Sequence, residues 1–321
     1  MNNITALLLK HQRKFPNGIW LILSLLILGV TSSWQSVKAS TPPNFLPNSS
    51  SVANATRTET ISLRERLINW SESRRAYTFS EEVKSEPSVQ PVALQNAPAE
   101  LKNLLTQMDA TASKGDIKGV MQLYSPTFTH GDGLNRQTLE QSLTAFWKRY
   151  PQLRYSTTLE SWKSEGNAIV AETVTNITGL PSANANNVGL NATIKSRQRI
   201  QGGRIVNQEI LSERTLLTSG NQPPQIDINL PQQVKVGEQY SFDAIVQEPL
   251  GDDFLLGTAV EEPVQPSKFL NPTSVDLELL TSGGLFKVGR APSTPGNQWI
   301  SAVILRGSGM TMVTQRLQVV R

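Results

Sequence analysis

The sequence predicts an α+β domain, with three helices packed on one face of a curved antiparallel sheet, followed by an all-β sandwich. Apolar residues recur at helical spacing between residues 97 and 150, and four strand-like runs follow them. Residues 222–321 then contain only short alternating runs separated by turn residues. The length of 321 residues also suggests two folded domains.

Residues 1–39 have the composition of an export signal. Lys10 and Lys14 precede the apolar run 19–30, and Val37 and Ala39 supply small residues before a cleavage site. This run is shorter than the roughly 20 residues that cross a bilayer, so we expect cleavage, with an uncleaved anchor as the alternative. We therefore expect an exported protein, periplasmic or otherwise extracytoplasmic, which contacts the membrane only through an uncleaved segment.

Residues 40–96 predict a flexible linker. Ser, Thr, Pro and Asn dominate its two ends, and such segments bury too little apolar surface to offset the entropy of ordering. Between these ends, Ile61–Trp70 has one apolar edge. It predicts a short helix, which is either transient or docks onto a folded domain or a membrane face.

Charge and composition exclude several classes of function. Four of the 30 basic residues lie in the first 39 positions, which contain no acidic residue, so 26 basic residues face 26 acidic ones in the rest. This balance argues against a nucleic-acid partner. The chain has no Cys and only two His, so we expect no disulfide, no thiolate nucleophile, no soft-metal site and no His-rich zinc or copper site. No phosphate-binding or dinucleotide-binding motif occurs, and we expect no cofactor.

The domain at 97–219 is expected to begin with two short helices. Gly115 ends the first, Asp116 caps the second, and Pro126 breaks the second after Tyr124. A short strand at Phe128–His130 and a glycine-rich turn come next.

A third helix is expected to begin at Thr138, with Gln141 as its capping-box partner, and to end before Pro151. Four strands are then expected, bounded by turn residues: Leu153–Trp162, Asn167–Thr178, Asn191–Ile200 and Arg204–Leu217.

Three motifs in this domain resemble a known superfamily. They read SKGDIKGVMQLYSPTFTHGD, FWKRYPQLRYS and GGRIVNQEILSE. They are similar to the nuclear transport factor 2-like superfamily, in its SnoaL-like and ketosteroid-isomerase-like branch, over about residues 97–219. The resemblance implies a cone in which a curved sheet wraps round a pocket that the helices close. This fold hosts isomerases, dehydratases, cyclases and many non-catalytic modules.

His130 and Asp132 are the candidate catalytic residues. Two apart on an extended segment, their side chains point to one side, and an imidazole beside a carboxylate can act as a general base. The alternative is a polar turn in which Asp132 bonds turn amides. The resemblance places Asp132 where ketosteroid isomerases keep their proton-moving aspartate. Met108 and Ser196 stand where that family has its tyrosine and second acid, so ketosteroid isomerisation is not expected.

Other residues are candidates for the pocket wall: Tyr124, Trp147, Tyr150, Ser196 and Gln198. The alternative for the three aromatic residues is a plain core position.

Lys195, Arg197 and Arg199 alternate with Ser196 and Gln198, so they are expected to face outward. This positive stripe would bind an anionic partner, pair with acidic residues in a dimer, or stay solvated.

Residues 222–321 predict a β-sandwich of immunoglobulin-like type, without the cysteines of antibody domains. Its expected strands are Ile226–Leu230, Tyr240–Gln247, Val275–Leu280, Leu285–Val288, Trp299–Arg306 and Thr311–Val320. Asp252-Asp253 and Glu261-Glu262 carry hard oxygen ligands suited to calcium, and the alternative is that both pairs lie in solvated loops.

The sequence favours a non-catalytic, exported cell-envelope protein. Its cone would bind a small apolar or amphipathic ligand, or mediate homodimerisation through its sheet or docking of an envelope partner. One alternative is a lyase or isomerase that uses Asp132 and His130 as acid and base. Another is a periplasmic binder of lipid or wall glycan that needs the sandwich for retention in the envelope.

Overall fold

The computed structural model describes residues 96–180, 188–251, 253–270, 275–307 and 309–321. The export signal and the short helix expected at 61–70 lie outside these residues, as does all but the end of the linker. No helix in the described part of the chain is long and apolar enough to cross a membrane.

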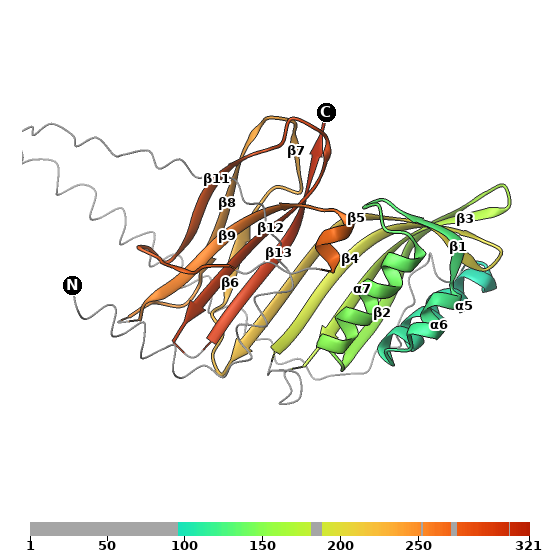
Figure 1. Cartoon of the computed structure of the whole chain (residues 1–321), viewed down its shortest axis with the longest axis horizontal. Coiled ribbons are helices and arrows are strands. Elements are labelled where there is room, and N and C mark those ends of the chain that lie inside the picture. Colours follow the sequence, from blue (N-terminus) through green and yellow to red (C-terminus); the bar gives the residue numbers. More distant parts are fainter. Residues whose placement is uncertain (1–95, 181–187, 252, 271–274, 308) are drawn as a thin grey trace, which may run out of the picture. The chain divides into compact units, whose positions relative to one another are not determined.

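The described residues form three α-helices, one 3-10 helix and thirteen strands (Figure 1). Their bounds are α5 Ala99–Ser113, α6 Ile117–Gln122, β1 Tyr124–His130, α7 Arg136–Arg149, β2 Leu153–Glu165, β3 Ala168–Gly179, β4 Val188–Gln201, β5 Arg204–Gly220, β6 Ile226–Asn229, β7 Gln233–Lys235, β8 Gln239–Val246, β9 Leu255–Pro263, η2 Pro266–Phe269, β10 Glu278–Leu279, β11 Gly284–Arg290, β12 Gly296–Arg306 and β13 Gly309–Val320.

Local chemistry sets where the helices begin. The Asp116 carboxylate accepts the N–H of Gly119 at 3.0 Å and caps α6 as expected. Helix α7 begins before Thr138, because Asn135 is its N-cap. The Asn135 side chain accepts the Thr138 N–H, and the Thr138 hydroxyl accepts the Asn135 N–H, both at 2.9 Å. Thr138 is therefore the inner member of the capping box and not its first residue.

Strand β1 is longer than expected and includes Pro126. Helix α6 ends at Gln122, so Tyr124 belongs to the strand and not to the helix. Pro126 is tolerated because the register between β1 and β5 is interrupted between Tyr124 and Thr129, where no ladder N–H is needed.

The expected arrangement, a three-helix cone followed by a separate sandwich, is wrong. Strand β13 pairs antiparallel with β5, from Gly309 opposite Gly220 to Gln315 opposite Arg214. One ten-stranded sheet therefore has the strand order β10-β9-β12-β13-β5-β4-β3-β2 (Figure 1). Its other two strands pair in parallel with strands of this path, β1 with β5 and β7 with β13. The end of β5 offers an open edge, and β13 fills it.

Strands β12 and β13 are buried on both faces over most of their length, and their buried residues include polar ones such as Ser301 and Thr314. Val303, Met310 and Met312 belong to the core that also contains the buried faces of α5 and α6. On the opposite face, Ile304 and Leu317 pack in a second core with β8, the centre of the three-stranded sheet β11-β8-β6.

The acidic pair at 261–262 lies in strand β9 and not in a solvated loop. Glu261 pairs with Lys287 at 3.0 Å, and the buried Glu262 pairs with Lys268 at 3.1 Å. Asp253 pairs with Arg306 at 3.0 Å, while Asp252 lies outside the described residues. The side chains of these described acids contact the chain's own cations.

Candidate functional site

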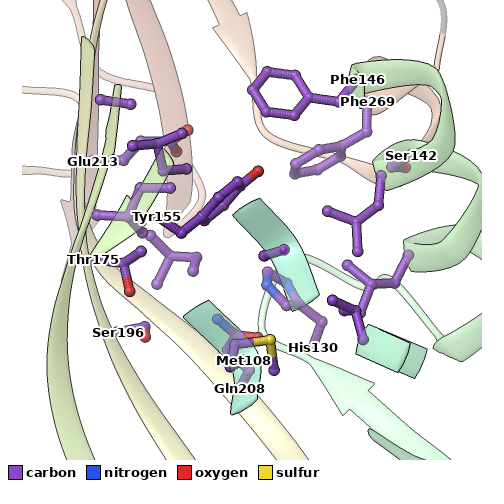
Figure 2. Close-up of a pocket in the computed structure, with 18 of the residues that line it drawn as sticks. Met108, His130, Ser142, Phe146, Tyr155, Thr175, Ser196, Gln208, Glu213 and Phe269 are labelled. Atoms are coloured by element: carbon purple, nitrogen blue, oxygen red, sulfur yellow. The ribbon is translucent and has the colours of Figure 1, made fainter. Parts of the chain in front are cut away.

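A cavity of about 310 Å³ lies between the helices and the sheet (Figure 2). Its wall is mainly apolar and aromatic, and it includes residues of α5, α7 and β2–β5. The C-terminal part of the chain completes the wall with Lys268 and Phe269 of η2, Trp299 of β12 and Arg316 of β13. Trp299 and Arg316 reach the cavity because β12 and β13 continue the sheet beyond β5.

The structure brings all seven sequence-predicted site residues to this wall: Tyr124, His130, Asp132, Trp147, Tyr150, Ser196 and Gln198. Each of them except His130 is buried as a whole residue, and the His130 side chain is only 6% exposed. The aromatic residues belong to the hydrophobic core as well as to the cavity wall. That these residues contact a ligand stays a prediction.

Asp132 forms a buried, two-pronged ion pair with Arg316. The guanidinium donates to Oδ1 at 2.8 Å and to Oδ2 at 2.9 Å, and the two side chains are 2% and 1% exposed. Asn297 also donates to Oδ1, at 3.4 Å. The Asp132 carboxylate therefore binds residues from β12 and β13, and not the amides of its own turn.

Strand topology explains why these distant residues meet. Strand β1 runs along the first part of β5, with His130 opposite Gln208, and β13 runs along the later part. The turn after β1 therefore lies near Arg316, which follows directly after the last register pair, Gln315 opposite Arg214. Glu213 accepts hydrogen bonds at Oε2 from Arg316 and from Trp299 Nε1, both at 3.0 Å. We call Asp132, Glu213 and Arg316 the buried cluster.

The side chains of His130 and Asp132 lie close together but form no hydrogen bond with each other. Nδ1 of His130 lies 3.7 Å from Oδ2 of Asp132 and instead accepts the backbone N–H of Asp132 at 3.1 Å. Burial lowers the pKa of His130, against the opposing effect of the Asp132 charge. The imidazole is therefore neutral near pH 7 and carries its proton on Nε2, which leaves it without a free basic nitrogen.

The charge of Arg316 is kept despite its burial. Burial lowers the pKa of the guanidinium, but the hydrogen bonds and charges of Asp132 and Glu213 outweigh that effect and raise it. A permanent cation thus faces two carboxylates inside the protein.

Tyrosine hydroxyls in the wall are neutral donors. Burial raises the pKa of Tyr150 and of Tyr155 to about 12. Tyr155 accepts Trp147 Nε1 at 2.8 Å, and Tyr124 donates weakly to Gln208 at 3.3 Å. The Tyr150 hydroxyl and Gln198 Oε1 are buried and have no hydrogen-bond partner among the described residues.

The positive stripe on the outer face of β4 is compensated by the chain's own carboxylates. Lys195 pairs with Glu160 and Glu172, Arg197 with Glu172 and Glu209, and Arg199 with Glu165. We call these seven residues the outer ladder. The cations of the ladder already have acidic neighbours, so this stripe does not favour an anionic partner.

Sequence reasoning missed Arg316, Glu213, Trp299 and Phe269 as site residues. For Arg316 a signal existed, since it is the one charged residue of the run Thr311–Val320. A charged residue in a strand that is buried on both faces requires a buried partner of opposite charge, and this requirement could have indicated Arg316.

Each comparison with known proteins covers only part of the chain. Residues 221–320 match the model of a family described as a domain of unknown function (DUF8623). No curated protein matches the chain.

Among solved structures, the chain is similar to a function-unknown protein from Mycobacterium tuberculosis, with 17% identity over 35% of this chain and 72% of that one and a TM-score of 0.29. It is also similar to an LEH-like epoxide hydrolase from the same species, with 11% identity over 35% and 80% and a TM-score of 0.26.

A Δ5-3-ketosteroid isomerase from a Mycobacterium species matches with 16% identity over 35% of this chain and 91% of that one and a TM-score of 0.26. The similarity thus covers about a third of the chain, and no activity is carried over from it. None of these findings bears on the immunoglobulin-like resemblance of residues 222–321.

Proposed function

We propose that this chain is a non-catalytic binding protein of the cell envelope, which holds a small, mainly apolar molecule in its cavity. The volume of about 310 Å³ is at the small end of ligand-binding pockets, which span roughly 300–1,000 Å³. The apolar and aromatic wall, with a few polar groups, has the composition of such pockets. The extracytoplasmic location rests on the export signal expected at residues 1–39.

The engagement of Asp132 by Arg316 is the observation that favours binding over catalysis. A lyase or isomerase would need Asp132 to take up a proton. Protonation would remove the main counterion of a buried guanidinium and leave it with Glu213 alone. His130 cannot replace it, because its Nδ1 accepts a backbone N–H and its Nε2 carries the proton.

In this proposal, residues of the C-terminal strands form part of the ligand-binding site, which residues of a separate sandwich domain would not do. Trp299 and Arg316 form part of the cavity wall, and they reach it through the pairing of β13 with β5. The binding site is thus built by both halves of the folded chain, so ligand binding should stabilise the described part as one unit.

A matched pair of variants on α7 tests the proposal. Ser142 lines the cavity and Thr144 is exposed, and each hydroxyl donates to the carbonyl four residues earlier at 2.7 Å. The probe is N-phenyl-1-naphthylamine, a neutral apolar fluorophore, titrated into the full-length chain. We expect Ser142→Phe to weaken its binding about tenfold or more, because overpacking costs about 1–3 kcal/mol.

Thr144→Phe should leave the affinity for the probe unchanged. Equal affinity of the wild type and Ser142→Phe would reject the cavity as the binding site. Absence of probe binding to the wild type would reject the proposed function itself.

A further inference from the structure

The charged groups of the cavity wall are unequally balanced. Asp109, Asp132 and Glu213 contribute three carboxylates, whereas Lys268 and Arg316 contribute two cations. Since His130 is neutral near pH 7, the wall carries net negative charge.

Both cations are already engaged by carboxylates of the chain. Arg316 binds Asp132 and Glu213, and Lys268 binds the buried Glu262 at 3.1 Å. Nε of Arg316 has no hydrogen-bond partner among the described residues, but two carboxylates already compensate the charge of this guanidinium. An anionic ligand would therefore enter a wall with excess negative charge. Transfer of an unpaired anion from water into such a cavity is strongly unfavourable.

Glu213, unlike the two cations, has an atom that is still free to accept a hydrogen bond from a ligand. Its Oε2 accepts two hydrogen bonds, while its Oε1 accepts none from any residue that the structure describes. The side chain is 19% exposed and lines the cavity. Its neighbour Trp299 packs edge-on against Phe269, with ring centroids 4.9 Å apart, and aromatic rings near a carboxylate favour a cationic group.

Gln198 provides a second, independent observation that indicates a ligand. It is 6% exposed, its Nε2 donates to Ser196 only at 3.4 Å, and its Oε1 has no partner in the described part of the chain. A buried acceptor without a donor is unfavourable, because it has lost its hydrogen bonds to water and gained none in the protein. A donor on a bound molecule would remove that cost.

Strand register places these two acceptors well apart. Ile194 of β4 lies opposite Glu213 of β5, and Gln198 lies four residues further along β4. Four residues of strand span about 13 Å. In Figure 2, Glu213 accordingly lies on one side of Tyr155, and Ser196 and Gln208, the neighbours of Gln198, lie on the other.

We infer that the cavity takes an elongated, mainly apolar primary amine, whose ammonium group binds Glu213 and whose far end carries a neutral hydrogen-bond donor for Gln198. An ammonium group has three donors and no acceptor, which suits the free Oε1 of Glu213. This inference rests on the proposed function and names the class of its ligand.

Three compounds of equal chain length test the charge. Octylamine, 1-octanol and octanoate are used at pH 7 to displace N-phenyl-1-naphthylamine from the full-length wild type. We expect octylamine to displace the probe at a concentration about tenfold or more below that of octanoate, with octanol in between. This comparison needs no variant, so it does not depend on the folding of a mutant.

Glu213→Gln should abolish the preference for the amine, measured as the ratio of the displacing concentrations of octanoate and octylamine on the same variant. The matched control is Glu209→Gln, which removes an exposed carboxylate from the outer face of the same strand and should leave the preference intact. The donor proposed for the other end of the ligand is tested separately. Because its hydroxyl can donate to Gln198, 8-amino-1-octanol should bind more tightly than octylamine, and Gln198→Leu should remove that difference in affinity.

The outcomes separate the two proposals. If octanoate displaces the probe as well as octylamine does, or if Glu213→Gln keeps the preference, the amine inference is overturned while the binding function stands. If 8-amino-1-octanol gains nothing over octylamine, the role of Gln198 is rejected. If the probe does not bind at all, both proposals fail.

Discussion

The two faces of strands β4 and β5 carry ion pairs in opposite environments. On the inner face, Glu213 belongs to the buried cluster, in which the Arg316 side chain is 1% exposed. On the outer face, the outer ladder joins glutamates to cations such as Arg197, whose side chain is 46% exposed. The chemistry of the groups is the same, and only their access to water differs.

This difference decides what each set of pairs contributes. Water already solvates the outer ladder well, so an ion pair there gains at most about 1 kcal/mol. Inside the protein, each charge has lost its water, and the pairing mainly offsets that loss. We therefore expect the buried cluster to be costly to disrupt at one residue, although it need not make the protein more stable than an apolar replacement would.

The largest expected effect is that of Arg316→Met. It leaves the carboxylates of Asp132 and Glu213 close together and without their cation, inside the fold. We expect the free energy of unfolding in urea to fall by about 3–5 kcal/mol.

The triple variant Asp132→Asn, Glu213→Gln, Arg316→Met is the control for the loss of charge. It removes the two unpaired carboxylates together with the cation, so its free energy of unfolding should be close to that of the wild type. A triple variant as unstable as Arg316→Met would mean that packing, and not the unpaired charge, accounts for the effect.

The second prediction concerns the pH dependence of the inner face. Burial lowers the pKa of His130 below its ordinary value of 6.5 in the folded chain. As the pH falls below 6.5, His130 therefore becomes protonated in the unfolded chain but stays neutral in the folded chain. The free energy of unfolding decreases over this range, until the pH falls below the pKa of His130 in the folded chain. Above pH 6.5 this contribution to stability is fully present.

His130→Asn keeps an acceptor near the N–H of Asp132 and removes the titration. We expect the urea midpoint of the wild type to fall more between about pH 7.5 and pH 5.5 than that of the variant. Other groups titrate alike in both proteins, so the difference isolates His130. Parallel pH profiles of the two proteins would show that burial does not perturb this imidazole.

Local patterns in the sequence predicted the elements on which the site is built. Helical periodicity and turn residues placed helices and strands near their observed positions between residues 97 and 219. The spacing of His130 and Asp132 on an extended segment also predicted that both side chains point to one side, and both line the cavity. These features depend on neighbours within a few residues, which the sequence shows directly.

Local patterns did not predict the partner of β5. Which strand fills a sheet edge depends on interactions between residues about a hundred positions apart, such as Arg214 with Gln315. The separation of the fold into a cone and a sandwich was wrong for this reason. Strand β9 was missed because its acidic pair resembles loop sequence, whereas Glu262 is buried against Lys268.

The smallest expected effect is on the outer face, at Arg197. Arg197→Met breaks the pairs with Glu172 and Glu209, which lie at 2.8 and 3.2 Å. We expect a loss of at most about 1 kcal/mol in the free energy of unfolding, measured in urea at low salt. Because mobile ions screen exposed charges, the loss should shrink further in 1 M NaCl, whereas that of Arg316→Met should not. A salt-independent loss of several kcal/mol at Arg197 would mean that the outer ladder is shielded from water, as it would be if another molecule covered this face.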